Sequence, residues 1–134
     1  MSRPILCVLI LLSVLPTALP GESYRSLTKK EDETAFYRSG GRSHQNRRVH
    51  LHVPARTIHG KPQKILTSRT GGRVLLFANR SVPLVIHPQN IYFRKILQRT
   101  SGSDQICVKG TVGAEPMGGP GRYAIFVQTL KKAP

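Results

Sequence analysis

Two histidines lie two positions apart, at His50 and His52, in a short run that alternates apolar and polar residues. Residues at this spacing share one face of an extended strand, so both imidazoles could reach one metal ion if His44, His59 or His87 came near. A zinc site normally has three or four protein ligands, and the carboxylates and thiolates that often complete the set are scarce in this chain. We therefore expect no metal site and no cofactor.

The same run is better suited to binding anions. Arg47, Arg48 and His50 have a basic–basic–gap–basic spacing that resembles heparin-binding segments. Arginine suits sulfate because its planar guanidinium donates two parallel hydrogen bonds. The alternative is a generally basic, hydrated surface. The predicted anion-binding residues are Arg47, Arg48, His50, His52, Arg94, Lys95 and Arg99, and Lys131 and Lys132 extend the set if their strands are neighbours.

A glycosylation motif and a lone cysteine also bear on function. Asn79-Arg80-Ser81 is an N-glycosylation sequon, which we expect in a tight turn between two strands. Cys7 belongs to the predicted signal peptide, so Cys107 has no partner for an internal disulfide in the mature chain. Cys107 is then either a buried free thiol, which we favour, or one half of an intermolecular bridge.

Basic pairs at Lys29-Lys30 and Arg47-Arg48 are potential sites for processing proteases. They raise an alternative function, a secreted precursor that releases a peptide from residues 22–46. Chance also explains such pairs in a chain this basic.

The sequence offers little for catalysis. Mechanisms that use paired carboxylates need two neighbouring acids, whereas the region after residue 35 contains only Asp104 and Glu115. G-x-S-x-G, P-loop and H-E-x-x-H motifs do not occur. We expect a protein that is not an enzyme, and a metal- or thiol-dependent enzyme is the third hypothesis.

The elements that would position these residues follow an N-terminal export signal. Arg3 precedes the uncharged apolar run 5–15, and Pro16 and Pro20 end that run well short of the roughly 20 residues that span a bilayer. We expect a signal peptide over residues 1–21, a disordered polar arm over 22–46 and a β-rich domain over 47–134, without a transmembrane span.

Period-two alternation predicts strands along the rest of the chain. Pro83 favours an edge position for the strand over 82–86, and residues 91–97 suit a strand or a short helix, of which we favour the strand. The predicted strands are 48–53, 64–67, 73–78, 82–86, 91–97, 106–112 and 123–130. This pattern indicates an all-β fold, a small antiparallel β-sandwich or barrel of about six strands.

Charge indicates the class of partner. Residues 35–134 hold 17 of the 21 lysines and arginines but only two of the six acids, and the whole chain carries +15. Such a field attracts polyanions. We expect a secreted, extracellular, monomeric binding protein whose partner is a sulfated glycosaminoglycan or an acidic cell-surface protein rather than nucleic acid. An unselected reading frame without a function would share this composition.

The export signal leads to the first prediction. Expressed in animal cells, the chain should appear in the medium without about its first 21 residues, because a charged start followed by a short apolar run directs translocation and cleavage. Mass spectrometry of the medium measures the new N-terminus. Recovery of an unprocessed chain from the cytosol would contradict the prediction.

Overall fold

The computed structural model describes residues 23–67 and 70–134. The predicted signal peptide, residues 1–21, and its Cys7 lie outside the described residues. The described part of the chain forms seven strands, three α-helices and one short 3-10 helix. None of these helices is long and apolar enough to cross a membrane.

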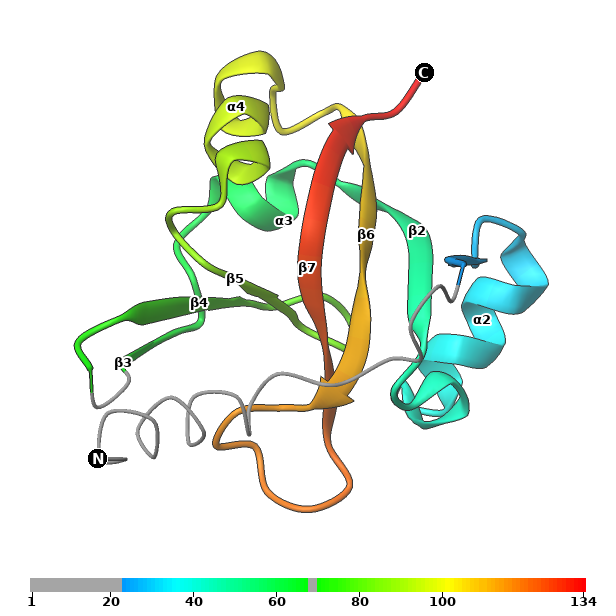
Figure 1. Ribbon diagram of the computed structural model, residues 1–134. Coiled ribbons are helices and arrows are strands. Elements are labelled where there is room, and N and C mark those ends of the chain that lie inside the picture. Colours follow the sequence, from blue (N-terminus) through cyan, green and yellow to red (C-terminus); the bar gives the residue numbers. More distant parts are fainter. Residues whose placement is uncertain (1–22, 68–69) are drawn as a thin grey trace.

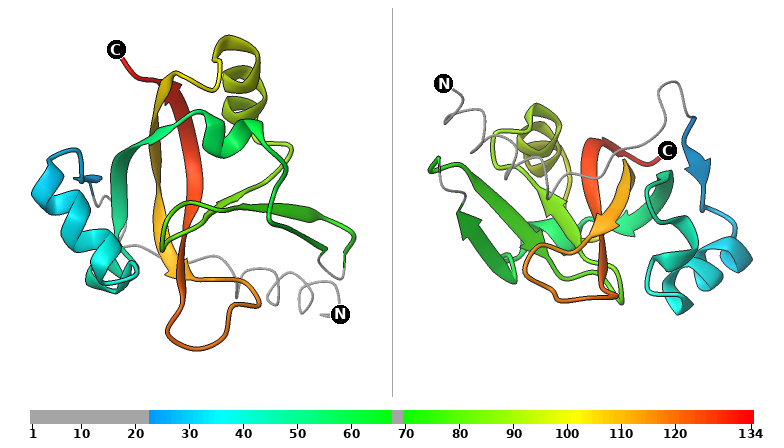
Figure 2. Two further views of the ribbon diagram at one scale, coloured as in Figure 1. Left: turned by 180° about the vertical axis from the view of Figure 1, so that it is seen from behind. Right: turned by 60° about the horizontal axis from the view of Figure 1, so that its bottom comes forward.

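The strands form one sheet in the order β1-β2-β6-β7-β5-β4-β3. They are β1 (Arg25–Ser26), β2 (Arg48–Pro54), β3 (Lys64–Thr67), β4 (Arg73–Phe77), β5 (Leu84–Ile86), β6 (Gln105–Ala114) and β7 (Tyr123–Lys132). The helices are α2 (Lys30–Arg38), η1 (Arg42–His44), α3 (Arg56–His59) and α4 (Ile91–Arg99). The β6–β7 hairpin stands in the middle of the molecule, between α2 on one side and β3 and β4 on the other (Figures 1 and 2).

The β-rich character of the fold was predicted, but the predicted closure was wrong. The sheet ends at β1 on one side and at β3 on the other, so it forms neither a barrel nor two stacked sheets. It is also mixed, because β1 pairs in parallel with β2 and β5 pairs in parallel with β7. The prediction erred because alternation identifies strands without saying which strands pair.

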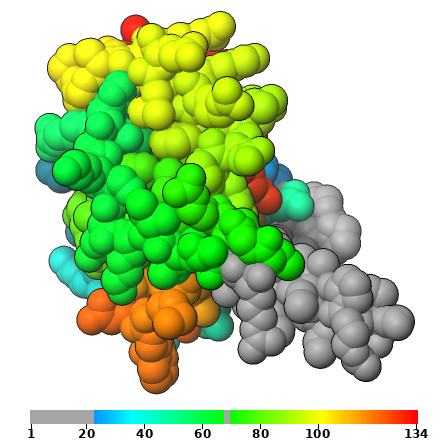
Figure 3. Space-filling view, turned by 90° about the vertical axis from the view of Figure 1, so that its left-hand side faces the viewer, coloured from blue at the N-terminus to red at the C-terminus, as the bar shows by residue number. Residues whose placement is uncertain are grey.

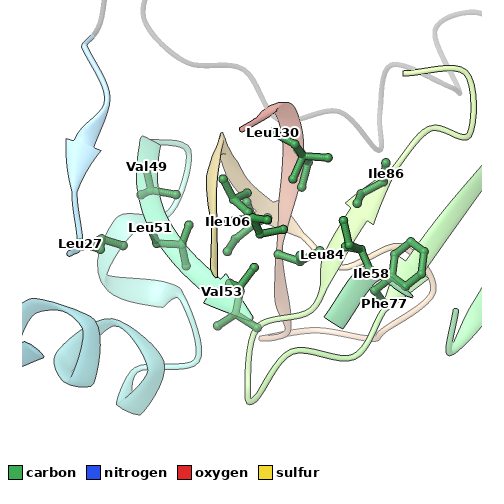
Figure 4. Packing of buried hydrophobic residues seen from close by; sticks show 14 of the residues in the cluster. Leu27, Val49, Leu51, Val53, Ile58, Phe77, Leu84, Ile86, Ile106 and Leu130 are labelled. Atoms are coloured by element: carbon green, nitrogen blue, oxygen red, sulfur yellow. The ribbon is translucent and has the colours of Figure 1, made fainter. Parts of the chain in front are cut away.

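Burial alternates along β2 as the sequence predicts. Val49, Leu51 and Val53 are buried, whereas the residues between them are only partly buried. Figure 4 shows these three side chains packed with residues of other strands, among them Ile106 and Leu84. The face of β2 that carries His50 and His52 is therefore turned away from this core.

The expectation of a disordered arm over residues 22–46 was wrong for the described part, residues 23–46. β1 pairs with β2, and α2 packs against the sheet. Leu27, Phe36 and Tyr37 are buried in the same core as the strands, so the expected boundary near residue 46 does not separate two units. This polar segment folds because Leu27, Phe36 and Tyr37 reach that core.

Two predicted strands also differ from the structure. Residues 91–99 form helix α4, whose first turn is capped by the Asn90 side chain, which accepts hydrogen bonds from the backbone N–H groups of Tyr92 and Phe93. The Asn90 cap and the buried pair Phe93 and Ile96, three residues apart, are helix signals that outweigh the strand pattern. α4 lies above β3 and β4 in Figure 3.

The strand at 84–86 lies in the interior of the sheet, not at its edge. β5 is paired with β7 on one side and β4 on the other, and all three of its residues are buried. Pro83 is compatible with this position because it precedes the strand, where its missing N–H removes no bond between strands.

The sequon Asn79-Arg80-Ser81 joins α2 to the sheet, because Asn79 and Arg80 contact Tyr37 and Glu33 of that helix. We call this set of contacts the Asn79 clamp. Asn79 is buried, and its Nδ2 donates hydrogen bonds to the Tyr37 hydroxyl at 2.9 Å and to the Val82 carbonyl at 3.1 Å. The Arg80 guanidinium lies 4.0 Å from the centre of the Tyr37 ring and 3.4 Å from the Glu33 carboxylate. Burial raises the pKa of Tyr37 above its ordinary value, although the hydrogen bond from Asn79 and the charge of Arg80 act in the opposite direction.

The clamp leads to a prediction about stability. Asn79→Ala and Tyr37→Phe should each lower the free energy of unfolding by about 1–3 kcal/mol, since each leaves a buried polar partner unsatisfied. The double variant should lose less than the sum of the two, because the same hydrogen bond is removed in both. Urea unfolding measures the three values. Additive losses would show that the two side chains do not stabilise the fold through each other.

A further prediction concerns stability in acid. Burial, and then the charges of Arg25 and Arg47, lower the pKa of His44 despite the nearby Asp32. The unfolded chain therefore binds more protons than the folded one as pH falls below about 6.5, and stability should decline from there through the lower folded pKa. Urea midpoints between pH 7.5 and 5 measure the decline. His44→Gln should flatten it, and an unchanged pH slope in this variant would exclude His44 as a cause.

Candidate anion-binding surface

The outer face of β2, β6 and β7 brings predicted residues from β2 together with lysines of the other two strands. Antiparallel pairing places His50 opposite Lys109 of β6, and His52 opposite Cys107. On its other side Cys107 lies opposite Lys131 of β7. The pairing thus creates rows of side chains across three strands that no local sequence pattern reveals.

Tyr24 contacts the basic residues at one end of this face. Its ring centre lies 5.7 Å from the Arg48 guanidinium and 5.4 Å from the Lys109 Nζ. Its hydroxyl donates a hydrogen bond to the Gln128 side chain of β7. Sequence reasoning missed Tyr24 because it lies in the segment that was expected to be disordered.

Four basic side chains gather at the other end of the same strands, around a groove of about 550 Å³ between α4 and β7. Lys95 and Arg99 come from the helix, and Lys131 and Lys132 come from the strand. The groove exists because β5 pairs with β7 at Ile125 and Phe126, so the following residues of that edge of β7 face α4. The Asn90 side chain donates to the Gln128 carbonyl at 3.2 Å and joins helix to strand there.

The groove keeps most of its positive charge. Lys132 Nζ lies 3.9 Å from Oδ1 of Asp104, whose other carboxylate oxygen, Oδ2, accepts a hydrogen bond from the Ser101 backbone N–H at 2.8 Å. Such a weak, exposed ion pair leaves Lys132 able to bind another anion. Lys95, Arg99 and Lys131 are exposed on the same groove.

The structure does not bring all the predicted residues together. Arg94 lines a separate hollow of about 620 Å³ with Arg73 and His87. Arg47 is exposed where β2 begins, at the opposite end of the strand from His52. The prediction of one continuous patch centred on Arg47 and Arg48 is therefore replaced by two clusters, one around Tyr24 and one at the groove.

His50 is a poor cation at neutral pH. Partial burial lowers its pKa, and electrostatic interaction with Lys109 and then with His52 lowers it further. The imidazole is therefore neutral near pH 7. Lysine and arginine, rather than His50, supply the positive charge of this face.

The histidines considered as further metal ligands lie away from His50 and His52. The ring centre of His44 is 5.7 Å from that of Phe36, and His59 Nε2 shares a hydrogen bond of 2.9 Å with the Thr100 hydroxyl. The neighbour that the fold supplies is Cys107, which is half-buried rather than fully buried.

The two acids considered for catalysis are far apart. Asp104 immediately precedes β6 and Glu115 immediately follows it. Ten residues of extended chain at about 3.3 Å each separate them by roughly 30 Å. They do not form a carboxylate pair.

The predicted processing sites are placed differently by the fold. Lys29 and Lys30 are exposed at the start of α2. At the second pair, the Arg47 carbonyl accepts a hydrogen bond of 3.0 Å from Val112 N–H, and Arg48 is already paired within the sheet. Cleavage there requires local opening of β2, and release of the preceding segment requires withdrawal of Phe36 and Tyr37 from the core.

Comparison with known proteins adds no family assignment. No protein-family model matches the chain, and no curated protein matches it. Among solved structures, OBody AM3L09 bound to hen egg-white lysozyme is 15% identical, with a TM-score of 0.36 over 67% of this chain and 84% of that chain. Asparaginyl-tRNA synthetase from Pyrococcus horikoshii is 18% identical, with a TM-score of 0.35 over 64% of this chain and 19% of that chain. A putative aspartyl-tRNA synthetase from Leishmania major Friedlin is 7% identical, with a TM-score of 0.40 over 93% of this chain and 25% of that chain. Similarity of this degree assigns the chain neither a family nor an activity.

Proposed function

We propose that this protein is a secreted binding protein that holds sulfated glycans at the groove between α4 and β7. The observation that carries the proposal is the convergence of Lys95, Arg99, Lys131 and Lys132 on one groove. Secretion rests on the predicted signal peptide. The proposal assigns the protein a binding role and no reaction.

The distribution of acids supports a directional field. Glu31, Asp32 and Glu33 lie on α2, which is beside β2 and on the far side of the sheet order from the groove. The groove itself has Asp104 as its nearby acid. Since the three acids of α2 outnumber its two bases, Lys30 and Arg38, a polyanion is attracted more strongly to the groove than to α2.

The groove also has room for more than a single ion. From Lys131, which lines the groove, a row of side chains continues past Cys107 to His52, on neighbouring strands that are about 4.8 Å apart. A sulfated glycan that lies across β7 and β6 would contact the α4 cations with one end and Lys109 of β6 farther along its length. Each sulfate that is bound releases counterions, so affinity should fall steeply with salt.

Heparin chromatography tests the groove directly. The protein should elute from immobilised heparin well above physiological ionic strength, about 0.15 M. The double variant Lys95→Ala, Arg99→Ala should elute at clearly lower salt, with a shallower dependence of affinity on salt, because it removes two of the four groove cations. Alanine is the best helix former, so α4 should persist.

The matched control removes Lys30 and Arg38, again one lysine and one arginine exposed on a helix. This pair lies on α2 and its loss should change elution little. Equal shifts for both double variants would mean diffuse charge instead of a site. Elution of the unaltered protein at or below physiological salt would exclude glycan binding.

A further inference from the structure

Three potential metal ligands lie together on the outer face of the sheet, next to the cations described above. His50 and His52 come from β2, and Cys107 comes from the neighbouring β6, directly opposite His52. Their ligating atoms all lie within 4.8 Å of one another, and each residue is half-buried. The two imidazole rings are 5.8 Å apart at their centres and inclined by 78°, so they do not stack against each other.

We propose that His50, His52 and Cys107 form a zinc site. Bonds of about 2.1 Å to nitrogen and 2.3 Å to sulfur place the ligand atoms of tetrahedral Zn²⁺ roughly 3.5 Å apart. Since the ligand atoms lie within 4.8 Å of one another, the side chains would have to close by at most about 1.3 Å to bind the ion. Two imidazoles and one thiolate form a ligand set that zinc prefers, whereas Ca²⁺ and Mg²⁺ prefer oxygen.

The electrostatic surroundings suit a thiolate-bound metal. A neutral imidazole is the form of histidine that binds a metal. On binding, Cys107 gives its thiol proton to solvent, and the sulfur lone pair forms the bond to zinc. Zinc and thiolate together carry one positive charge. Lys109 and Lys131, which flank the cluster in the strand pairing, disfavour a bare cation but favour an anion as fourth ligand.

The second imidazole distinguishes this cluster from a nucleophilic cysteine. A thiol nucleophile needs one base, itself oriented by a third group. Here both histidines stand on the same strand within reach of one sulfur. With three protein ligands, the fourth position of the metal is open to water or a small anion, as in zinc sites that bind exogenous ligands.

Cobalt and zinc titrations of the full, reduced chain test the site. Co²⁺ should give one equivalent of binding, with a sulfur-to-cobalt charge-transfer band and the intense visible bands of a tetrahedral ion. Zn²⁺ should displace it and raise the melting temperature, because a ligand that binds only the folded state stabilises it. Cys107→Ser should abolish the charge-transfer band, and His52→Ala should weaken zinc binding at least about tenfold.

His59→Ala is the control, since His59 is an exposed histidine that contacts Thr100 outside the cluster. It should bind both metals as the unaltered chain does. Absence of a charge-transfer band in the unaltered chain, or an equal loss in His59→Ala, would overturn the proposal. The readouts are independent of heparin binding, so the zinc site and the glycan groove stand or fall separately.

Discussion

The register of β2 against β6 is the constraint on which the rest of the structure depends. Val49, Leu51 and Val53 must all face the core, because a slip by one residue would turn them to solvent and bury Arg48 and two histidines instead. That register places His52 opposite Cys107. The register of β2 also fixes which β7 residues share its rows of side chains, because the same β6 residues pair with β7 on their other side. Burial of one face thus arranges the chemistry of the opposite face.

Local patterns predicted the strands that have one polar face or end in clear breaks. β2, β3, β4, β6 and β7 all appear within a few residues of their predicted bounds. The failures have physical reasons. Residues 91–99 form a helix instead of a strand because of the Asn90 cap and the apolar face of α4. Residues 23–46 fold because a core built from residues far away in the sequence accepts Phe36 and Tyr37, which no local pattern indicates.

For the candidate sites, too, contacts between residues far apart in the sequence could not be predicted from local patterns. Composition predicted an excess of cations, and the four cations that line the groove were identified, but their grouping required the contact between α4 and the edge of β7. The pairing of Cys107 with the histidines could not be predicted, because 54 positions of chain separate it from His52 and only the strand order brings them together. Side-chain type was predictable, and proximity across strands was not.

The Asn79 clamp has a consequence for how a cell would treat this chain. The side-chain amide that a glycosyltransferase must reach is buried, and it donates to both Tyr37 and Val82 in the fold. A sugar can then be attached only before α2 closes over this corner, and the sugar itself would keep the corner open. In a compartment that contains the transferase, the fraction of chains glycosylated at Asn79 would report how fast this corner of the molecule folds. Rapid folding would leave the sequon without a sugar, and slow folding would leave a sugar attached to Asn79.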